Sequence, residues 1–228
     1  MFYNDAELGL LTYKKINAPV LNEEGNIQFY IKGSDADFSR CNWEPVEYRK
    51  YRDDEVGRIC KKYGASRVLI FDGEKLKEEI KAPECKTHVY YNGPLNCFIL
   101  LYRITKDDRF IRNMAKQNFL IPVRILTKKD GYPEIKYLSS TKKGSDTRYH
   151  VLFSDHEEYN KWKKATGGVG FNDLIQITAA KLFSLDKAHG GNRTYELCIN
   201  PYGNKLILEK EKRRVFYQSV KEKQQRRK

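Results

Sequence analysis

The sequence predicts an α+β protein in which a mixed β-sheet is flanked by helices. Short apolar runs with the two-residue period of strands alternate with segments that have the 3.6-residue period of amphipathic helices. Near the C-terminal end, Tyr195–Ile199 and Lys205–Leu208 are separated by a turn sequence typical of a hairpin. The chain has 228 residues, of which 40% are hydrophobic and 13% aromatic, so it can bury a core without disulfides or metal.

The first predicted region, residues 1–85, is an N-terminal α/β subregion of unknown type. Asn26–Lys32 alternates apolar and polar residues and predicts a strand. Asp53–Tyr63 carries apolar residues at i, i+3, i+4 and i+7 and predicts a helix. Arg67–Phe71 predicts a buried strand, and we expect Lys75–Ile80 to form a short helix.

The second region begins with Leu95–Ile104, an apolar run compatible with either a helix or a strand. Phe110–Met114 has a helical apolar face, and Ile135–Leu138 predicts a short strand. Phe119–Leu126 predicts another strand. Pro122 within it lacks an N–H, so we expect this strand at a sheet edge or at a bulge.

Residues 139–147 are polar and predict a surface loop, followed by a strand over Arg148–Phe153. Ser154–Glu157 has the form of a capping box with Ser154 as the N-cap, and predicts a helix to about residue 165. We expect Asn172 to cap a further helix. Its apolar positions are Leu174, Ile175, Ala179, Leu182 and Phe183.

The net charge of +13 is concentrated toward the C-terminal end of the sequence. From Glu209 to Lys228, nine Lys or Arg stand against three Glu. We therefore expect residues 211–228 to form a basic C-terminal tail, as a charged helix that frays into solvent. Contact with nucleic acid and contact with an acidic protein partner are the alternatives for this tail.

The sequence predicts a cytoplasmic protein with no membrane contact. No apolar stretch approaches the ~20 residues of a membrane helix, and the first residues lack the basic and apolar regions of a signal peptide. The five cysteines are widely spaced and odd in number, which predicts free thiols.

We find no catalytic constellation in the sequence. The phosphate-binding loop of nucleotide hydrolases and the serine elbow of esterases are both missing. The histidines His88, His150, His156 and His189 have no neighbour at metal-ligand spacing. We therefore predict no catalytic residues, no metal and no cofactor.

Four ordered segments carry a resemblance to a known family: NFLIPVRI, YHVLFSDHEEYNKW, GFNDLIQI and ELCINPYGNKLIL. They resemble the SseB protein N-terminal domain family, found in bacteria, over about residues 95–210. The matching residues are Leu120, Pro122, Val123, Phe153, Ser154, Asp155, Glu157, Trp162, Phe171, Asp173, Leu174, Ile199, Asn200, Pro201, Gly203, Asn204 and Leu208. Ser154 replaces the usual Thr, and Tyr202 the usual Phe. The family has no established reaction, so the resemblance implies a fold and does not extend to residues 1–85.

The candidate binding residues lie in the motif turns and in the basic tail. They are Asp155, Trp162, Asn200, Tyr202, Arg213, Arg214, Phe216 and Tyr217. The expected function is a non-catalytic binding or regulatory module for a protein partner. One alternative is a nucleic-acid-binding accessory protein in which the basic tail contacts phosphates and Phe216 and Tyr217 stack on bases. Another is an enzyme of unrecognised type.

Overall fold

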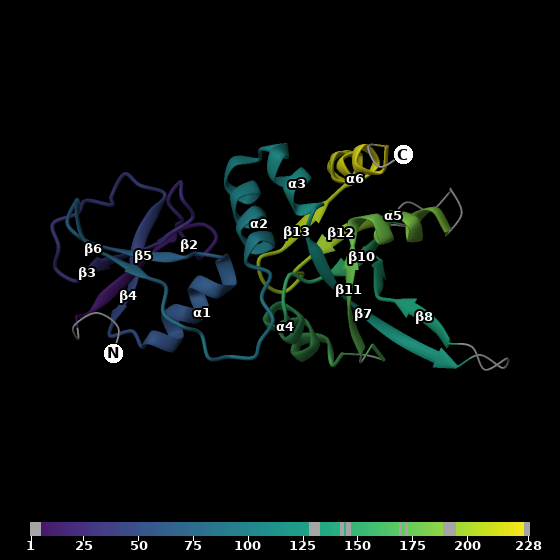
Figure 1. Ribbon diagram of the computed structural model, residues 1–228, viewed down its shortest axis with the longest axis horizontal. Coiled ribbons are helices and arrows are strands. Elements are labelled where there is room, and N and C mark those ends of the chain that lie inside the picture. Colours follow the sequence, from purple (N-terminus) through teal and green to yellow (C-terminus); the bar gives the residue numbers. More distant parts are fainter. Residues whose placement is uncertain are drawn as a thin grey trace. The chain divides into compact units, whose positions relative to one another are not determined.

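The computed structural model describes residues 6–127, 133–141, 144, 147–168, 170–171, 173–188 and 195–225. The chain divides into two compact units, residues 1–88 (unit 1) and 89–228 (unit 2) (Figure 1). Sheets with parallel and antiparallel pairs occur together with helices, which confirms the predicted α+β class. None of the described helices is long and apolar enough to span a membrane.

Unit 1 is built on one twisted sheet and one helix. Its elements are β1 (Leu8–Tyr13), β2 (Ala18–Pro19), β3 (Ile27–Ile31), β4 (Trp43–Arg49), α1 (Asp53–Tyr63), β5 (Arg67–Asp72) and β6 (Lys75–Lys81). The strands follow the order β2-β1-β3-β5-β6, and β4 also pairs with β1. Among the described strands of unit 1, β3 and β5 form the one parallel pair. The strand and helix predicted at β3 and α1 are confirmed, as is the strand at β5.

Helix α1 has the start, face and end that its sequence predicts. The backbone N–H of Arg52 donates to Glu55 Oε2 at 3.0 Å, which closes the first turn. Val56, Cys60 and Tyr63 form the buried stripe of the helix. Gly64 ends it with φ 73°, a left-handed conformation that glycine adopts without steric cost.

Strand β6 corrects the prediction of a helix over Lys75–Ile80. Asp72 pairs with Lys75, so β5 and β6 form a hairpin with only Gly73 and Glu74 between them. Gly73 has φ +63°, the conformation that tight two-residue hairpin turns require. Pairing with a buried neighbouring strand outweighs the helical propensity of the Lys and Glu residues.

Unit 2 contains two sheets that backbone hydrogen bonds join between Leu120 and Phe153 and through Leu138. Its elements are α2 (Gly93–Thr105), α3 (Asp108–Met114), β7 (Asn118–Thr127), β8 (Pro133–Tyr137), β9 (Ser139–Thr141), β10 (Arg148–Leu152), α4 (His156–Thr166), β11 (Asp173–Thr178), α5 (Ala179–Ala188), β12 (Tyr195–Ile199), β13 (Leu206–Leu208) and α6 (Lys210–Gln225). The strand orders are β13-β12-β10-β9 and β11-β7-β8. Leu120 and Phe153 exchange two backbone hydrogen bonds of 2.8 Å and so connect the sheets.

The two faces of the four-stranded sheet are covered by different helices (Figure 1). The main core lies between the sheets and helices α2, α3, α5 and α6. A second cluster on the opposite face packs Val151 and Phe153 against Tyr159 and Trp162 of α4. Tyr159 and Trp162 therefore pack on the sheet.

Strand β7 is central in its sheet, so the expectation that Pro122 marks a sheet edge or a bulge is wrong. Along one edge, β7 pairs with Phe153 at Leu120. Two residues later, at Pro122, the same edge pairs with the segment that follows β8. The Pro122 carbonyl accepts from the Leu138 N–H at 2.9 Å. Because the N and O of one strand residue face the same edge, the Pro122 nitrogen lies where β7 changes partners. A missing N–H costs little at that junction.

Two further predictions in unit 2 need correction. Residues 173–178 form strand β11, which pairs with β7, and the helix begins only at Ala179. Asn172, expected to cap that helix, lies outside the described residues. Within the predicted loop 139–147, Ser139–Thr141 forms strand β9, antiparallel to β10. The ambiguous segment 95–104 is helical in α2, with Asn92 Oδ1 accepting from the Leu95 N–H at 3.1 Å.

Helix α6 corrects the expectation of a tail that frays into solvent. Phe216 is fully buried in the main core, where its ring lies 5.8 Å from that of Phe119. Tyr217 and Val220 are also buried. Residues 211–222 therefore belong to the folded body of unit 2.

Candidate binding surfaces of unit 2

A buried polar network joins the start of α4 to the turn after β12. Asn200 Oδ1 accepts from the Ser154 N–H at 3.0 Å, and Asn200 Nδ2 donates to Ser154 Oγ at 2.9 Å. Ser154 Oγ in turn donates to Asp155 Oδ2 at 3.0 Å, and Asn96 Nδ2 of α2 donates to the same oxygen at 2.8 Å. Each of these four residues is at most 2% exposed. The network therefore connects α2, β10, α4 and β12.

Asp155, rather than Ser154, is the N-cap of α4. Its Oδ1 accepts from the Glu158 N–H at 2.9 Å, one position later than the predicted capping box. Asp155 and Asn200, both predicted to bind a partner, are brought together through Ser154. Both are fully buried, so they position the surrounding surface and do not contact a partner themselves.

Gly203 brings the same turn close to the buried side chain of Glu158. A Cβ at position 203 would overlap Glu158 Oε2. Glu158 is 1% exposed, and its Oε1 accepts from Lys161 Nζ at 2.7 Å. The motif glycine is explained by this close approach, which leaves no room for a side chain.

A groove of about 540 Å³ lies over the sheet face that α4 leaves partly uncovered. We call it the sheet groove. Its floor is formed by register-matched residues of β10, β12 and β13: Tyr149, Val151, Cys198 and Ile207. Its rim is polar and carries charges of both signs, from Ser140, Thr141, Lys205 and Glu209.

The walls of the sheet groove are aromatic. Trp162 lies 5.7 Å from Tyr159 and 5.8 Å from Phe153, so its ring is held firmly by its neighbours. On the other side, Pro201 and Tyr202 come from the turn held by Asn200. Tyr202 is 53% exposed and offers most of its ring to solvent. Two predicted binding residues, Trp162 and Tyr202, thus line the same groove.

The titratable groups on the groove floor are held in their neutral forms. Burial raises the pKa of the Cys198 thiol above its ordinary value, and Lys205 only partly opposes this. Burial, together with the carboxylates of Glu196 and Glu209, raises the pKa of Tyr149. A protonated thiol is a poor nucleophile, so the floor is suited to packing and hydrogen bonding.

The four predicted residues of the basic tail have different environments. Phe216 is fully buried and Tyr217 is 5% exposed, so neither ring can stack on bases, contrary to the prediction. Arg213 Nη1 donates to the Tyr195 carbonyl, whereas Arg214 is exposed.

A second pocket, of about 380 Å³, lies between α5 and α6; we call it the α5–α6 pocket. Phe183, Arg213, Arg214, Tyr217, Gln218 and Lys221 line it.

Within the described part of the chain, no group of three or more His, Cys, Asp or Glu residues could hold a metal ion. All five cysteines are free thiols. Burial raises the pKa of Cys60 to about 12 and also raises that of Cys97.

Several groove residues did not emerge from the sequence, among them Tyr149, Cys198 and Lys205. They meet only because β10 and β12 pair in parallel across more than forty residues of chain. Their one local signal is alternation along each strand, which indicates two faces without saying which is covered.

A scan against models of known protein families, a search of curated proteins and a search of solved structures each gave no match.

Proposed function

We propose that unit 2 is an SseB-like, non-catalytic module that binds a protein partner through the sheet groove. The observation that carries the proposal is the groove itself: Tyr202, which is 53% exposed, lines it above a neutral floor with a polar rim, and Trp162, which is 7% exposed, forms a packed part of its wall. Tyrosine and tryptophan are the residues most enriched at the energetic centres of protein interfaces. An extended segment of the partner fits such an open groove.

The arrangement of the four motif segments supports the family resemblance. The first motif lies on β7 and the third on β11, where Pro122 is paired with Leu174. The second and fourth motifs meet through Ser154 and Asn200. Motifs that are separated in sequence but adjacent in the fold are what a shared domain architecture requires.

The chemistry of the floor favours recognition over catalysis. Cys198 is the one thiol among the groove's lining residues, and burial keeps it protonated at neutral pH. No histidine is among the described residues that line the groove. We also propose a cytoplasmic location, which the free thiols support; cell fractionation with an antibody to the protein tests it.

The experiment compares partners captured by the wild type and by a groove variant. Tyr202→Ala combined with Lys205→Glu removes the exposed ring and reverses the charge at the rim, while the buried network stays intact. Quantitative mass spectrometry of affinity-purified complexes should show one or more proteins depleted at least tenfold by this variant. The purified candidate should then bind wild-type protein directly in a calorimetric titration.

The matched control is Tyr48→Ala in unit 1, which removes a ring that is 38% exposed and is not among the residues that line the groove. It should retain the wild-type partner. If every captured protein is retained equally by both variants, the groove is not the binding surface. A turnover assay in which the purified protein converts a small molecule would favour the enzyme alternative instead.

A further inference from the structure

The positive charge of the protein belongs entirely to unit 2. Residues 1–88 contain 15 Lys and Arg against 16 Asp and Glu, whereas residues 89–228 contain 28 against 14. Unit 1 therefore has a net charge of −1 and unit 2 a net charge of +14. The excess positive charge of unit 2 favours an anionic partner for that unit.

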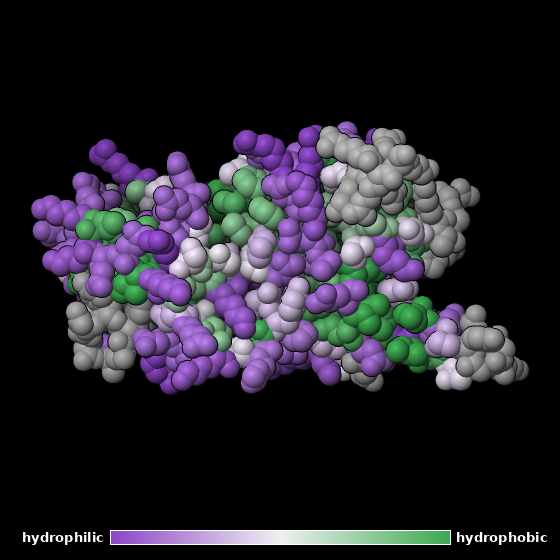
Figure 2. Space-filling model, in the orientation of Figure 1, coloured by the Kyte–Doolittle hydropathy of each residue, from purple (hydrophilic) through white to green (hydrophobic). Residues whose placement is uncertain are grey.

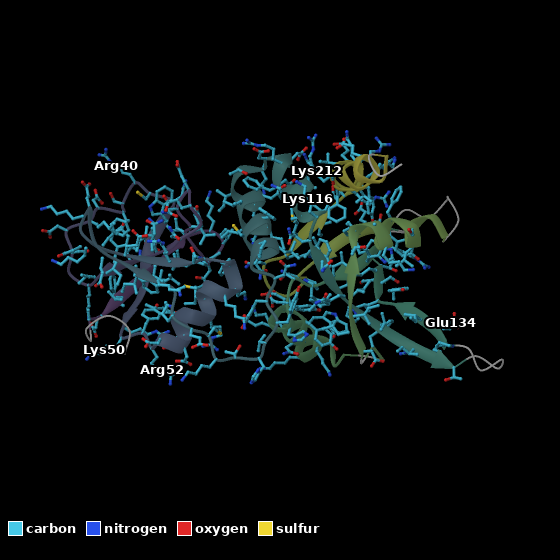
Figure 3. The ribbon with its side chains drawn as sticks, in the orientation of Figure 1. Arg40, Lys50, Arg52, Lys116, Glu134 and Lys212 are labelled. Atoms are coloured by element: carbon cyan, nitrogen blue, oxygen red, sulfur yellow. The ribbon has the colours of Figure 1, made fainter. Side chains whose placement is uncertain are left out.

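Helix α6 carries cations on two flanks, and only one flank is neutralised locally. On the side of α3, Lys212 Nζ forms an ion pair of 2.8 Å with Asp108. Lys116, labelled with Lys212 in Figure 3, is also engaged locally: its Nζ donates to Asn113 Oδ1 at 2.9 Å. On the side of α5, Arg214 and Lys221 are exposed, and neither forms an ion pair with another described residue.

The cations on the α5 side converge on the α5–α6 pocket. Arg214, Gln218 and Lys221 are spaced by four and three residues, which places them along one face of α6. Arg213 lies at the same pocket, with one arm of its guanidinium fixed on the Tyr195 carbonyl. The six lining residues include three cations and no carboxylate.

The pocket also has an aromatic wall. The rings of Phe183 and Tyr217 lie 5.1 Å apart and are tilted by 47°. Lys221 Nζ lies 5.5 Å from the centre of the Phe183 ring. Phe183 is half-buried, so one part of its ring remains available, whereas Tyr217 is nearly covered.

We propose that the α5–α6 pocket binds a nucleotide unit of single-stranded nucleic acid. Arg214 and Lys221 hold the phosphate, because guanidinium and ammonium groups bind phosphate oxygens through charge-assisted hydrogen bonds. Phe183 contacts the base, because an aromatic side chain beside cations is the usual means of binding single strands. The site differs from the one predicted from sequence, in which Phe216 and Tyr217 stack on bases.

The test measures binding of a fluorescently labelled 12-nucleotide oligo-uridine by anisotropy, over a series of salt concentrations. The variant Arg214→Gln with Lys221→Gln should bind at least tenfold more weakly than the wild type. Its plot of log affinity against log salt should be shallower by about 1.4 units, because each lost phosphate contact on a single strand contributes about 0.7. Arg213 is left in place because it fastens α6 to β12.

The control variant, Lys136→Gln with Lys164→Gln, removes the same charge from β8 and α4, where both side chains are exposed. It should lose no more than about twofold in affinity, because it weakens only the general attraction that depends on net charge. Its salt slope should equal that of the wild type. Equal losses in the two variants, or no binding by the wild type at low salt, would overturn the proposal.

Two competitors separate the sources of the anion. Uridine monophosphate should displace the oligonucleotide when the pocket holds a nucleotide unit. Displacement by inorganic phosphate alone to the same extent would contradict a role for the base.

Phe183→Leu should weaken binding of the oligo-uridine several-fold and leave binding of an abasic strand of equal length unaffected. Tighter binding of poly-glutamate than of the oligonucleotide would assign the pocket to an acidic protein and refute the nucleic-acid proposal.

Discussion

Asn200 fixes the end of β12 to the start of α4 through a single neighbour, Ser154. Asn200→Ala would leave the buried Ser154 N–H without its acceptor. We expect the free energy of unfolding of unit 2 to fall by about 2–3 kcal/mol, the cost of an unsatisfied buried polar group. Urea denaturation followed by Trp162 fluorescence measures this loss. Asn113→Ala, which removes only an exposed hydrogen bond to Lys116, should change stability by less than about 0.5 kcal/mol.

Gly203 and Glu158 provide a test of steric coupling. Gly203→Ala places a methyl group against the Glu158 carboxylate, and we expect a loss of about 1–3 kcal/mol from overpacking. In the background of Glu158→Ala the obstructing atoms are gone, so the same substitution should cost much less. A double-mutant cycle measured by urea unfolding gives the coupling. Equal costs in the two backgrounds would show that the turn relaxes without contacting Glu158.

At the scale of residues, the sequence indicates the turn and cap positions well but not their partners. Asp155 and Asn200 could be selected because Ser-Asp and Asn-Pro-x-Gly are recognisable local patterns. Either Ser154 or Asp155 can cap a helix. Asp155 is the cap because its own backbone is extended and bridged to Tyr91, so the helix begins only at His156. The contact of Asp155 with Asn96 spans 59 residues and leaves no local trace.

Helix α6 is the element whose packing differs most from its sequence-based expectation. Phe216→Ala should lower the free energy of unfolding of unit 2 by about 3–5 kcal/mol, because it removes a fully buried ring from the main core. Thermal and urea unfolding both measure this effect. Gln218→Ala, on the exposed side of the same helix, should cost less than about 0.5 kcal/mol. A small effect of Phe216→Ala would mean that α6 detaches readily from the sheet.

Two strands were predicted as helices for the same physical reason. Lys75–Lys81 is rich in Lys and Glu, and its apolar residues are too few to reveal a period. Asp173–Thr178 has apolar residues that also fit a helical stripe continuing into α5. Both are strands because each lies beside a buried strand, β5 or β7. The backbone N–H and C=O groups along that edge of β5 or β7 need hydrogen-bond partners, and the neighbouring strand supplies them. Such tertiary pairing is not visible in a window of the sequence.

Helix α1 contains a thiol that makes unit 1 sensitive to alkali. The pKa of Cys60 is about 12 in the folded state, above the ordinary value of 9.0 that applies when the chain is unfolded. The folded state therefore holds its proton more tightly, and stability present below pH 9 is lost as pH rises toward 12. Between pH 8 and pH 10 we expect a loss of about 1 kcal/mol from this group.

The measurement is urea unfolding of unit 1 at the two pH values, with Trp43 as the reporter in a Trp162→Phe background. Cys60→Ala should reduce the dependence on pH by about 1 kcal/mol. Val56→Ala, a packing control on the same buried stripe, should lower stability at both pH values and keep the wild-type slope. An unchanged slope in Cys60→Ala would contradict the prediction.

At the scale of the whole molecule, the two units differ in charge and are joined by a segment without regular structure. Residues 82–90 lie between β6 and α2 and contain neither helix nor strand. Limited proteolysis should cut first in this segment and leave two resistant fragments. On a cation exchanger the fragment with residues 89–228 should elute at higher salt than the fragment with residues 1–88. Early cleavage within β7 or α6 instead would contradict the division into two folded units.

The placement of α6 in the core has a consequence for how the protein is made. Ribosomes add about 5–20 residues each second, and the main core of unit 2 lacks Phe216 until that part of the chain has emerged. Unit 1 has all its strands roughly 7–27 s earlier and can fold while translation continues. Strands β12 and β13 emerge late in that interval, and the face that they present to α6 stays uncovered until α6 follows. Unit 2 can therefore complete its core only after α6 has emerged, well after unit 1 can fold.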